Sequence, residues 1–265
     1  MSDPAASEPP SDSPPSGTIP AATVVIFRTA ADGGPPELLM VQRARAMRFA
    51  GGAAVFPGGR IDPADRDLAA RLGIADASSA DPDQGAARIA GIRETLEETG
   101  LAIALERPVS AAEAADARAF LLEQGALAPV IERFGWRLLP DRLVPFAHWC
   151  PPSEGAFDTR FFLADLGSGQ VDITVDETEN TRLFWASASE ILARDDLTVI
   201  FPTRRNLERL AQFACFDDAC ADAARHPIAR LSANVVDRDG EAWLTIPDGF
   251  GYPVLGQTLE SAKRG

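Results

Sequence analysis

Cysteine and histidine are scarce in this chain of 265 residues. Its three cysteines (Cys150, Cys215 and Cys220) and two histidines (His148 and His226) do not form the short paired spacings of a zinc site. The odd cysteine count, with no disulfide framework, is typical of a reducing compartment, so we expect a cytoplasmic protein. We expect all three thiols to be buried among apolar side chains.

Long apolar segments are also lacking. No run of about 20 apolar residues occurs, so we expect no membrane span. Residues 1–20 are rich in Pro, Ser and Ala and contain no apolar stretch of the kind found in secretory signals. This composition predicts a disordered tail.

Positive charge is in deficit, because the formal net charge is -14. Such an acidic chain is unsuited to non-specific nucleic-acid binding, which needs a basic surface. One segment departs from this trend, since no acidic residue interrupts Arg43, Arg45, Arg48 and Arg60. These arginines either bind an anionic substrate or lie on a solvated surface of strand and loop.

The stretch from Arg93 to Gly100 is the most informative part of the chain. At about 100° per residue, a helix places Glu94, Glu97 and Glu98 within roughly a third of its circumference. The apolar Ile89, Ile92 and Leu96 fall on the opposite side. The pattern predicts a helix at about 84–99 that buries one face and presents three carboxylates on the other.

Stability alone would not favour this arrangement. Like charges one turn apart destabilise a helix by about 0.2–0.5 kcal/mol per pair, and acidic groups in the last turn oppose the helix dipole. Oxygen clusters of this kind suit hard divalent cations such as Mg²⁺. The other interpretation is a solvated acidic face supported by Arg93, one turn before Glu97.

Upstream, an apolar pair breaks at Pro57-Gly58-Gly59. Paired glycines mark a turn or a close approach of the backbone to a ligand. Gly100 follows the helix, where a glycine C-cap is expected. A glycine turn followed by Arg93-Glu94, Glu97-Glu98 and Gly100 resembles the signature box of Nudix hydrolases.

The resemblance implies an α/β fold, an α/β/α sandwich with a mixed sheet. It also implies hydrolysis of a diphosphate linkage with Mg²⁺ or Mn²⁺ as the cofactor. Two features depart from the family pattern. Residues 61–83 lengthen the interval between glycines and helix, and we expect 62–65 and 77–82 to be loop. The family's Glu eight residues before the box Arg is Gly85 here, with Asp83 and Gln84 close by.

The insertion is similar to that of the branch acting on coenzyme A and acyl-coenzyme A. The pattern Arg88-Ile89 to Arg93-Glu94, residues 160–163 and residues 207–214 resemble that branch too. The spacing of Arg43, Arg48 and Gly52 before the box is similar to a coenzyme A signature. We expect a coenzyme A diphosphatase, with hydrolysis of a dinucleotide or nucleoside diphosphate sugar as the alternative. A non-catalytic binding module would not need the three glutamates.

Roles for individual residues follow from the resemblance. Metal ligands are expected at Glu94, Glu98, Glu97 and the carbonyl of Gly59. The catalytic set is Glu94, Glu97 and Arg93, with Arg93 orienting a carboxylate. The general base is either Glu94 or an acid within 176–179, with Glu179 the candidate there. Arg43 and Arg48 are the expected contacts to substrate phosphates.

The chain is expected to contain a tail (1–20), a Nudix domain (21–200) and a C-terminal extension (201–265). Strands are predicted at 22–28, 38–43, 101–105, 143–149, 159–164 and 181–185, and a hairpin around 237–240. Helices are predicted at 110–123, 127–134, 190–193 and 203–214, the first with a Ser110–Glu113 capping box. Residues 215–265 cap the sandwich, form a homodimer contact or cover an acyl channel, and composition does not decide among these.

Overall fold

The computed structural model describes residues 17–43, 52–74, 81–167 and 180–264. Its main sheet has the order β3-β2-β1-β6-β5-β8, with β4 also on β1 and β7 also on β2. The β1–β6 and β5–β8 pairs are parallel and the other pairs antiparallel, so the sheet is mixed. The strands are β1 (Ile19–Arg28), β2 (Glu37–Arg43), β3 (Ala54–Val55), β4 (Gly58–Arg60), β5 (Val144–Trp149), β6 (Phe157–Asp165), β7 (Asn180–Ser187) and β8 (Arg230–Leu231).

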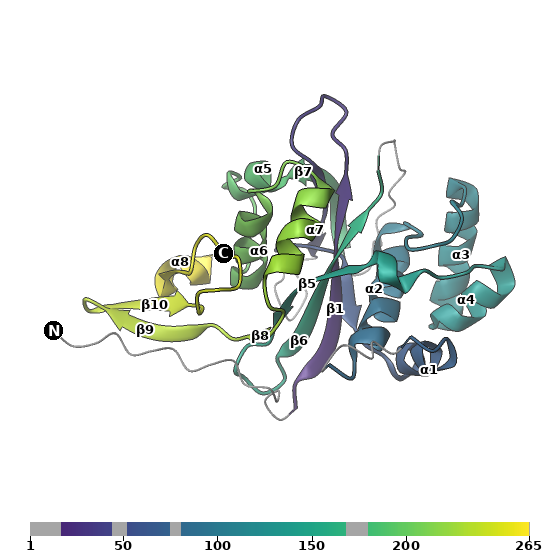
Figure 1. Cartoon of the computed structure of the whole chain (residues 1–265), viewed down its shortest axis with the longest axis horizontal. Helices are drawn as coiled ribbons and strands as arrows, with labels where there is room; N and C mark the ends of the chain where they lie inside the picture. The colour runs from purple at the N-terminus through teal and green to yellow at the C-terminus, as the bar shows by residue number, and fades with distance from the viewer. Residues whose placement is uncertain (1–16, 44–51, 75–80, 168–179, 265) are drawn as a thin grey trace.

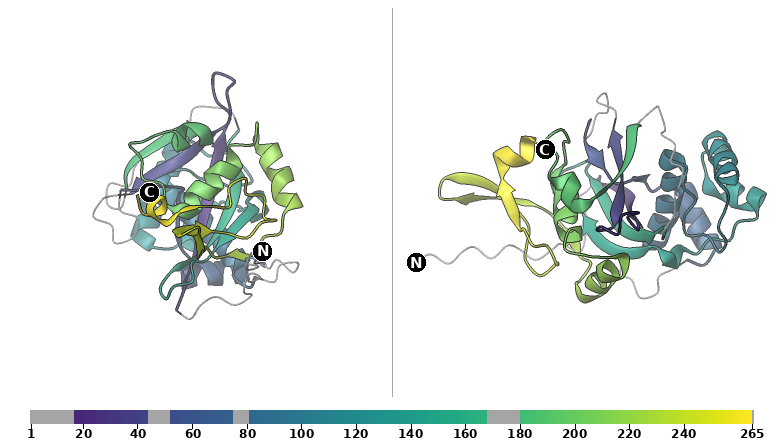
Figure 2. Two further views of the ribbon diagram at one scale, coloured as in Figure 1. Left: turned by 90° about the vertical axis from the view of Figure 1, so that its left-hand side faces the viewer. Right: turned by 90° about the horizontal axis from the view of Figure 1, so that it is seen from above.

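Helices cover both faces of this sheet (Figures 1 and 2). One face carries α1 (Pro63–Arg71), α2 (Gln84–Thr99), α3 (Ala111–Gln124) and α4 (Leu127–Phe134). The other carries α5 (Ala188–Leu192), α6 (Phe201–Leu210) and α7 (Phe216–Arg225). Side chains of β1 alternate between the two faces of the sheet and so contribute to both hydrophobic cores. Val24 and Ile26 pack on the α2 side, while Val25 and Phe27 pack on the α6 side. The predicted α/β/α sandwich is confirmed.

Helix α2 has the predicted bounds and ends at Gly100, whose φ of 75° is left-handed. The expectation that it buries a single face is wrong. The helix lies between the sheet and the outer helices, and a Cβ added at Gly91 would lie 2.9 Å from a methyl of Val24. Ile89, Ile92 and Leu96 pack in the core on this side of the sheet. Its carboxylates therefore lie in a largely buried setting.

The insertion before α2 contains a helix. Residues 62–65 were predicted as loop, but Asp62 is the N-cap of α1 and Pro63 stands at its first position. Proline is well tolerated there because the first helical N–H has no partner within the helix. Residues 75–80, and with them most of the second predicted loop, lie outside the described residues.

Residues 101–105 are not a strand, although Leu101, Ile103 and Leu105 are buried as their alternation suggests. Ala104 has a φ of 53°, and only Leu105 forms a bridge, to Leu138. Helices α3 and α4 match their predictions. Ser110 accepts a hydrogen bond from the Glu113 N–H, but the Glu113 carboxylate bonds Arg107 and Trp136 rather than closing a capping box.

The C-terminal region was partly predicted. Ser187 caps α5, which begins two residues before the predicted 190–193. Helix α6 ends at Leu210, earlier than predicted, and α7 was missed. The hairpin is confirmed as β9 (Asn234–Arg238) and β10 (Glu241–Thr245), and β11 (Gly256–Thr258) and α8 (Leu259–Arg264) follow it. Of the cysteines, Cys150 is buried and Cys220 partly so, but Cys215 is exposed because it precedes α7 at the surface.

No helix in the described part of the chain is both long and apolar enough to cross a membrane.

Candidate functional site

The glycine strand β4 lies directly against two glutamates of α2. The Gly58 N–H donates to Glu98 Oε2 at 2.9 Å. A Cβ added at Gly59 would lie 2.4 Å from Glu94 Oε1, and one added at Gly58 would lie 2.3 Å from the carbonyl oxygen of Ala22. These glycines are therefore required by close approach. The fold brings together Gly59, Glu94 and Glu98.

Arg93 connects the site to the insertion. Its Nε and Nη2 donate to the Asp65 carboxylate at 3.0 Å each, and its Nη2 also donates to the Arg60 carbonyl at 2.8 Å. Its Nη1 donates to Glu94 at 2.9 Å and to Glu97 at 3.2 Å. Because Arg93 and Asp65 are buried, this guanidinium is fixed in place. Two of the three glutamates are thus oriented by a single arginine.

The three carboxylates differ in their access to water. The Glu97 side chain is 36% exposed and that of Glu94 15% exposed, while Glu98 is buried. Burial raises the pKa of Glu94 to about 8, against the opposing charge of Arg93. The charges of Glu98 and Glu97 add to this rise in pKa. Glu94 is therefore largely protonated at neutral pH until positive charge approaches it.

No group of three or more His, Cys, Asp or Glu side chains within the described ranges is gathered closely enough to hold a metal ion. The glutamates still fit a hard divalent cation in their chemistry, because all their donor atoms are oxygens. Burial outweighs the opposing charge of Arg93 in raising the pKa of Glu94. A cation bound at Glu94 below about pH 8 would release a proton.

Other predicted site residues are less well placed or fall outside the described ranges. Arg43 ends β2, and its Nε is buried without a hydrogen-bond partner among the described residues. Arg60 is exposed and takes part through its backbone carbonyl. Arg48 and the acidic segment 176–179, including Glu179, lie outside the described residues.

Sequence reasoning missed Asp65. The position eight residues before Arg93, where the family has its Glu, is Gly85. No side chain fits there, because an added Cβ would lie 2.0 Å from the carbonyl oxygen of Ile74. Asp65 stands six residues after Gly59, in the first turn of α1, and forms the ion pair with Arg93. Counting forward from the glycines would have found it. Arg118 was missed too, and its Nε donates to the Glu97 carbonyl at 2.8 Å.

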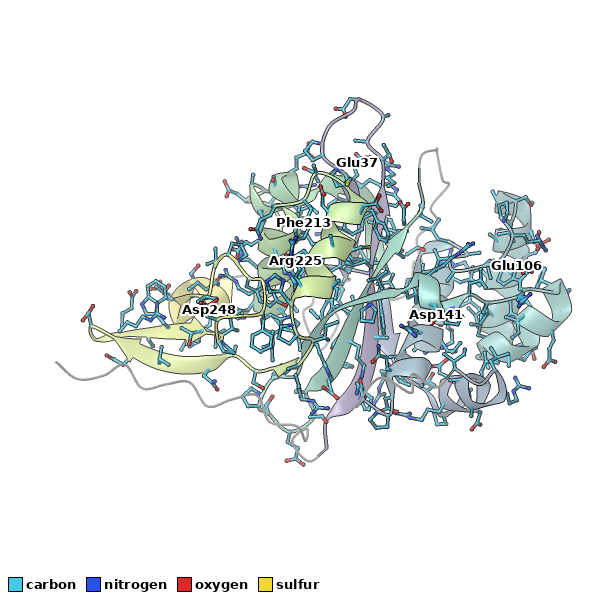
Figure 3. The ribbon with its side chains drawn as sticks, viewed as in Figure 1. Glu37, Glu106, Asp141, Phe213, Arg225 and Asp248 are labelled. Atoms are coloured by element: carbon cyan, nitrogen blue, oxygen red, sulfur yellow. The ribbon has the colours of Figure 1, made fainter. Side chains whose placement is uncertain are left out.

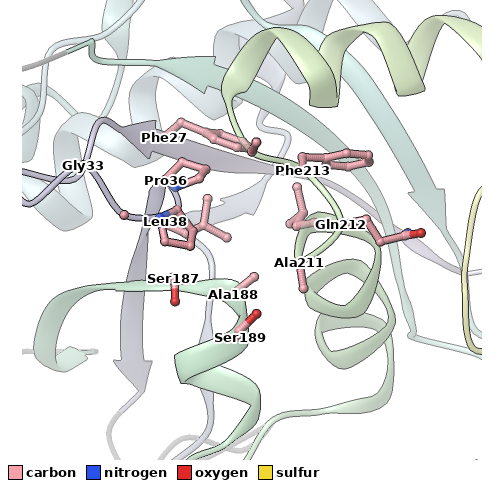
Figure 4. A pocket seen from close by; sticks show the side chains of 14 residues that line it. Phe27, Gly33, Pro36, Leu38, Ser187, Ala188, Ser189, Ala211, Gln212 and Phe213 are labelled. Carbon is pink, nitrogen blue, oxygen red and sulfur yellow. The ribbon is translucent and has the colours of Figure 1, made fainter.

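A pocket of about 400 Å³ lies away from these residues, between the β1–β2 turn and the adjoining ends of α5 and α6 (Figure 4). Phe27, Leu38, Ser187 and Phe213 are among its lining residues, none of which is charged. It offers neither the carboxylates that a cation needs nor the cations that a diphosphate needs. The glutamates of α2 therefore remain the candidate site.

No family model matches the chain. It is similar to the crystal structure of a Nudix hydrolase from Alicyclobacillus acidocaldarius, with 29% identity over 77% of this chain and 96% of that chain and a TM-score of 0.65. A MutT protein from Methanosarcina mazei Go1 covers 75% of this chain and 95% of its own, with 16% identity and a TM-score of 0.40. At that TM-score the second likeness supports no inference.

The likeness to the Alicyclobacillus acidocaldarius enzyme spans nearly all of that chain. It agrees with the mixed sheet between two helical layers and with the glycine strand against the glutamates of α2. On these findings the chain is a Nudix hydrolase, an enzyme that hydrolyses diphosphate linkages.

Proposed function

We propose that the substrate is coenzyme A or an acyl-coenzyme A. Water would add across the diphosphate, giving a phosphopantetheine product and adenosine 3′,5′-bisphosphate. The observation that carries this proposal is the insertion, which contributes Asp65 to the carboxylate site through Arg93. The similarity of residues 88–94 and of the Arg43, Arg48 and Gly52 spacing to the coenzyme A branch supports it further.

The cofactor in this proposal is Mg²⁺ or Mn²⁺. Glu94, Glu97, Glu98 and the Gly59 carbonyl would hold the ions. When bound, such ions neutralise the charge that develops on a diphosphate and lower the pKa of bound water. Arg93 holds Glu94 and Glu97 by hydrogen bonds, and the Gly58 N–H holds Glu98. These contacts fix the carboxylates before substrate arrives, which lowers the cost of organising the site.

Two candidates for the general base stay open. Glu94 has a pKa of about 8, so once ionised it accepts protons well near neutral pH. An acid within 176–179, Glu179 in particular, is the second candidate. Arg43 and Arg48 are proposed to bind the substrate phosphates, since guanidinium groups pair well with phosphate oxygens.

Hydrolysis of a dinucleotide or a nucleoside diphosphate sugar is the second candidate function, because the same glutamates and cations would serve it. A non-catalytic module is disfavoured because the partly buried Glu94 lies beside the buried Glu98, an arrangement that costs stability.

A hydrolysis screen with Mg²⁺ tests the proposal. Coenzyme A and acyl-coenzyme A thioesters are compared with dinucleotides and nucleoside diphosphate sugars, and we expect the highest kcat/KM for the first group. Glu98→Gln should lower kcat by more than about 100-fold, exceeding the 10–100-fold typical of losing an outer contact to a metal ligand. Glu132→Gln on α4, whose side chain is 69% exposed, is the matched control and should retain activity.

Two results would count against these assignments. A clear kcat/KM preference for dinucleotides or sugar nucleotides would transfer the assignment to the second candidate. Full activity of Glu98→Gln would remove this glutamate from the cation site.

A further inference from the structure

A surface pocket of about 900 Å³ lies on the insertion side of the molecule. It is bounded by the end of α1, by α4 and by the segment 136–142, with Arg88 contributed by α2. None of its lining residues is one of the glutamates, the glycines of β4 or Arg93. Its volume lies within the range of about 300–1,000 Å³ seen for small-molecule sites. It is therefore a second, separate candidate binding site.

The pocket is basic in an otherwise acidic chain. Arg88, Arg137 and Arg142 line it, together with one acidic residue, Asp141. Asp141 accepts from Arg88 at 3.0 Å, so the positive excess comes from Arg137 and Arg142. Figure 3 labels Asp141 close to this pocket. The pocket thus presents an excess of positive charge while the whole chain carries -14.

The guanidinium groups of Arg142 and Arg137 are only weakly neutralised by their present partners. Arg142 Nη1 donates to the Leu105 carbonyl oxygen at 2.7 Å, which carries no formal charge. Arg137 pairs with Glu106 at 2.9 Å, but both side chains are more than half exposed. Exposed ion pairs contribute little to stability, because water competes for both charged groups. Both arginines are therefore available to an incoming anion.

Apolar side chains form the rest of the wall. Leu72 is 46% exposed at the end of α1 and gives the pocket an apolar wall in contact with water. Ile74 and Ile131 line the pocket beside it. The Trp136 Nε1 donates to Glu113 at 2.8 Å, so this indole already has its hydrogen bond and offers only apolar ring surface. A ligand with an apolar body would cover these surfaces.

We propose that this pocket binds an amphipathic organic anion, an apolar body that ends in a carboxylate or a phosphate. The arginines match the planar or tetrahedral oxygens of such a head group. The aliphatic wall removes the apolar body from water, which favours binding in proportion to the apolar surface buried. A purely apolar ligand would offer no anion to Arg137 and Arg142, and a purely polar anion would leave Leu72 in water.

Calorimetric titration with octanoate and octyl phosphate tests the proposal and distinguishes the two head groups. Octyl glucoside, which has the same chain without charge, is the comparison ligand. Binding of either anion, and at least tenfold weaker binding of the glucoside, is expected. Absence of binding by both anions, or equal binding of the glucoside, overturns the proposal.

Variants locate the bound anion. Arg142→Gln and Leu72→Asp should each weaken anion binding at least tenfold, and both positions are exposed, so the fold should survive. The matched controls are Arg71→Gln, at the end of α1, and Leu122→Asp, on α3. Leu122 is 55% exposed, and neither residue lines the pocket. Equal losses in the controls would place the anion elsewhere.

The separation from the diphosphate site is tested with Glu98→Gln. This variant should bind octanoate as tightly as the unaltered protein, with or without a saturating diphosphate substrate. Displacement of octanoate by that substrate would overturn the claim that the two sites are separate.

Discussion

At the scale of single residues, two glycines illustrate two different constraints. A Cβ at Gly59 would meet the carboxylate end of Glu94, the mobile end of a side chain. A Cβ at Gly85 would meet the carbonyl oxygen of Ile74, which belongs to the backbone. A side-chain tip moves aside at small cost, whereas backbone must be displaced along with everything packed on it. We therefore expect Gly59 to be needed for activity and Gly85 to be needed for stability.

Alanine at each position separates these roles. Gly59→Ala should lower kcat by about 100-fold or more, because it displaces a proposed metal ligand, while Tm changes by only a few degrees. Gly85→Ala should lower Tm substantially, since overpacking costs about 1–3 kcal/mol or more. Its folded fraction at low temperature should keep normal kcat. Thermal melting and steady-state assays on both proteins check this, and an active Gly59→Ala would contradict it.

At the scale of elements, helix α2 was the most predictable part of the molecule. Its periodic Ile89, Ile92 and Leu96 and its closing Gly100 act within one segment, so local sequence determined its bounds. Its surroundings were not predictable in the same way. Its burial on more than one face comes from α1, α3 and α4, whose positions depend on tertiary packing.

The errors have related causes. Asp62-Pro63 suggests a turn, yet the same pair starts a helix when Pro takes the first position. Leu101, Ile103 and Leu105 alternate as a strand would, but they fill the core without a neighbouring strand beside them. In both places the local sequence correctly indicates a boundary between elements or a buried side chain. It does not show which neighbouring segment pairs with these residues, and that neighbour determines whether they form a helix, a strand or a loop.

The contact between α1 and α2 gives the prediction at this scale. Asp65→Asn would remove the fully buried counter-charge of Arg93 and leave it only the more exposed carboxylates, and breaking a buried ion pair costs about 3–5 kcal/mol. Glu94 and Glu97 would lose their fixed orientation, so Mn²⁺ affinity should fall about 10–100-fold. Urea denaturation and Mn²⁺ titration measure the two effects. Asp67→Asn, at an exposed position of the same helix, should change neither quantity, and an unaltered Asp65→Asn would refute the role given to this pair.

At the scale of the whole molecule, the C-terminal segment is built into the α6 side of the sheet. Tyr252 is buried, and its hydroxyl accepts from Trp149 at 3.0 Å and donates to Asn206 at 2.9 Å. These partners lie on β5 and α6, so one hydroxyl joins three distant parts of the chain. Burial raises the pKa of Tyr252 to about 12, which keeps this hydroxyl a donor at any ordinary pH. Arg209 lies over the Phe146 ring at 4.2 Å and pairs with Asp222 on α7.

This bonding predicts that the extension and the sheet unfold together. Tyr252→Phe removes both hydrogen bonds and leaves buried polar groups less well satisfied, so the free energy of unfolding should fall by about 1–3 kcal/mol. Because the carboxylates of α2 lie across the sheet, kcat should stay unchanged. Tryptophan fluorescence and far-UV circular dichroism should give one coincident urea transition in both proteins. Trp243→Phe, on the projecting hairpin of Figure 1, is the control and should cost little. If Tyr252→Phe instead produced two separate transitions, residues 201–265 would be a unit that folds on its own, and the cooperative link through Tyr252 would be wrong.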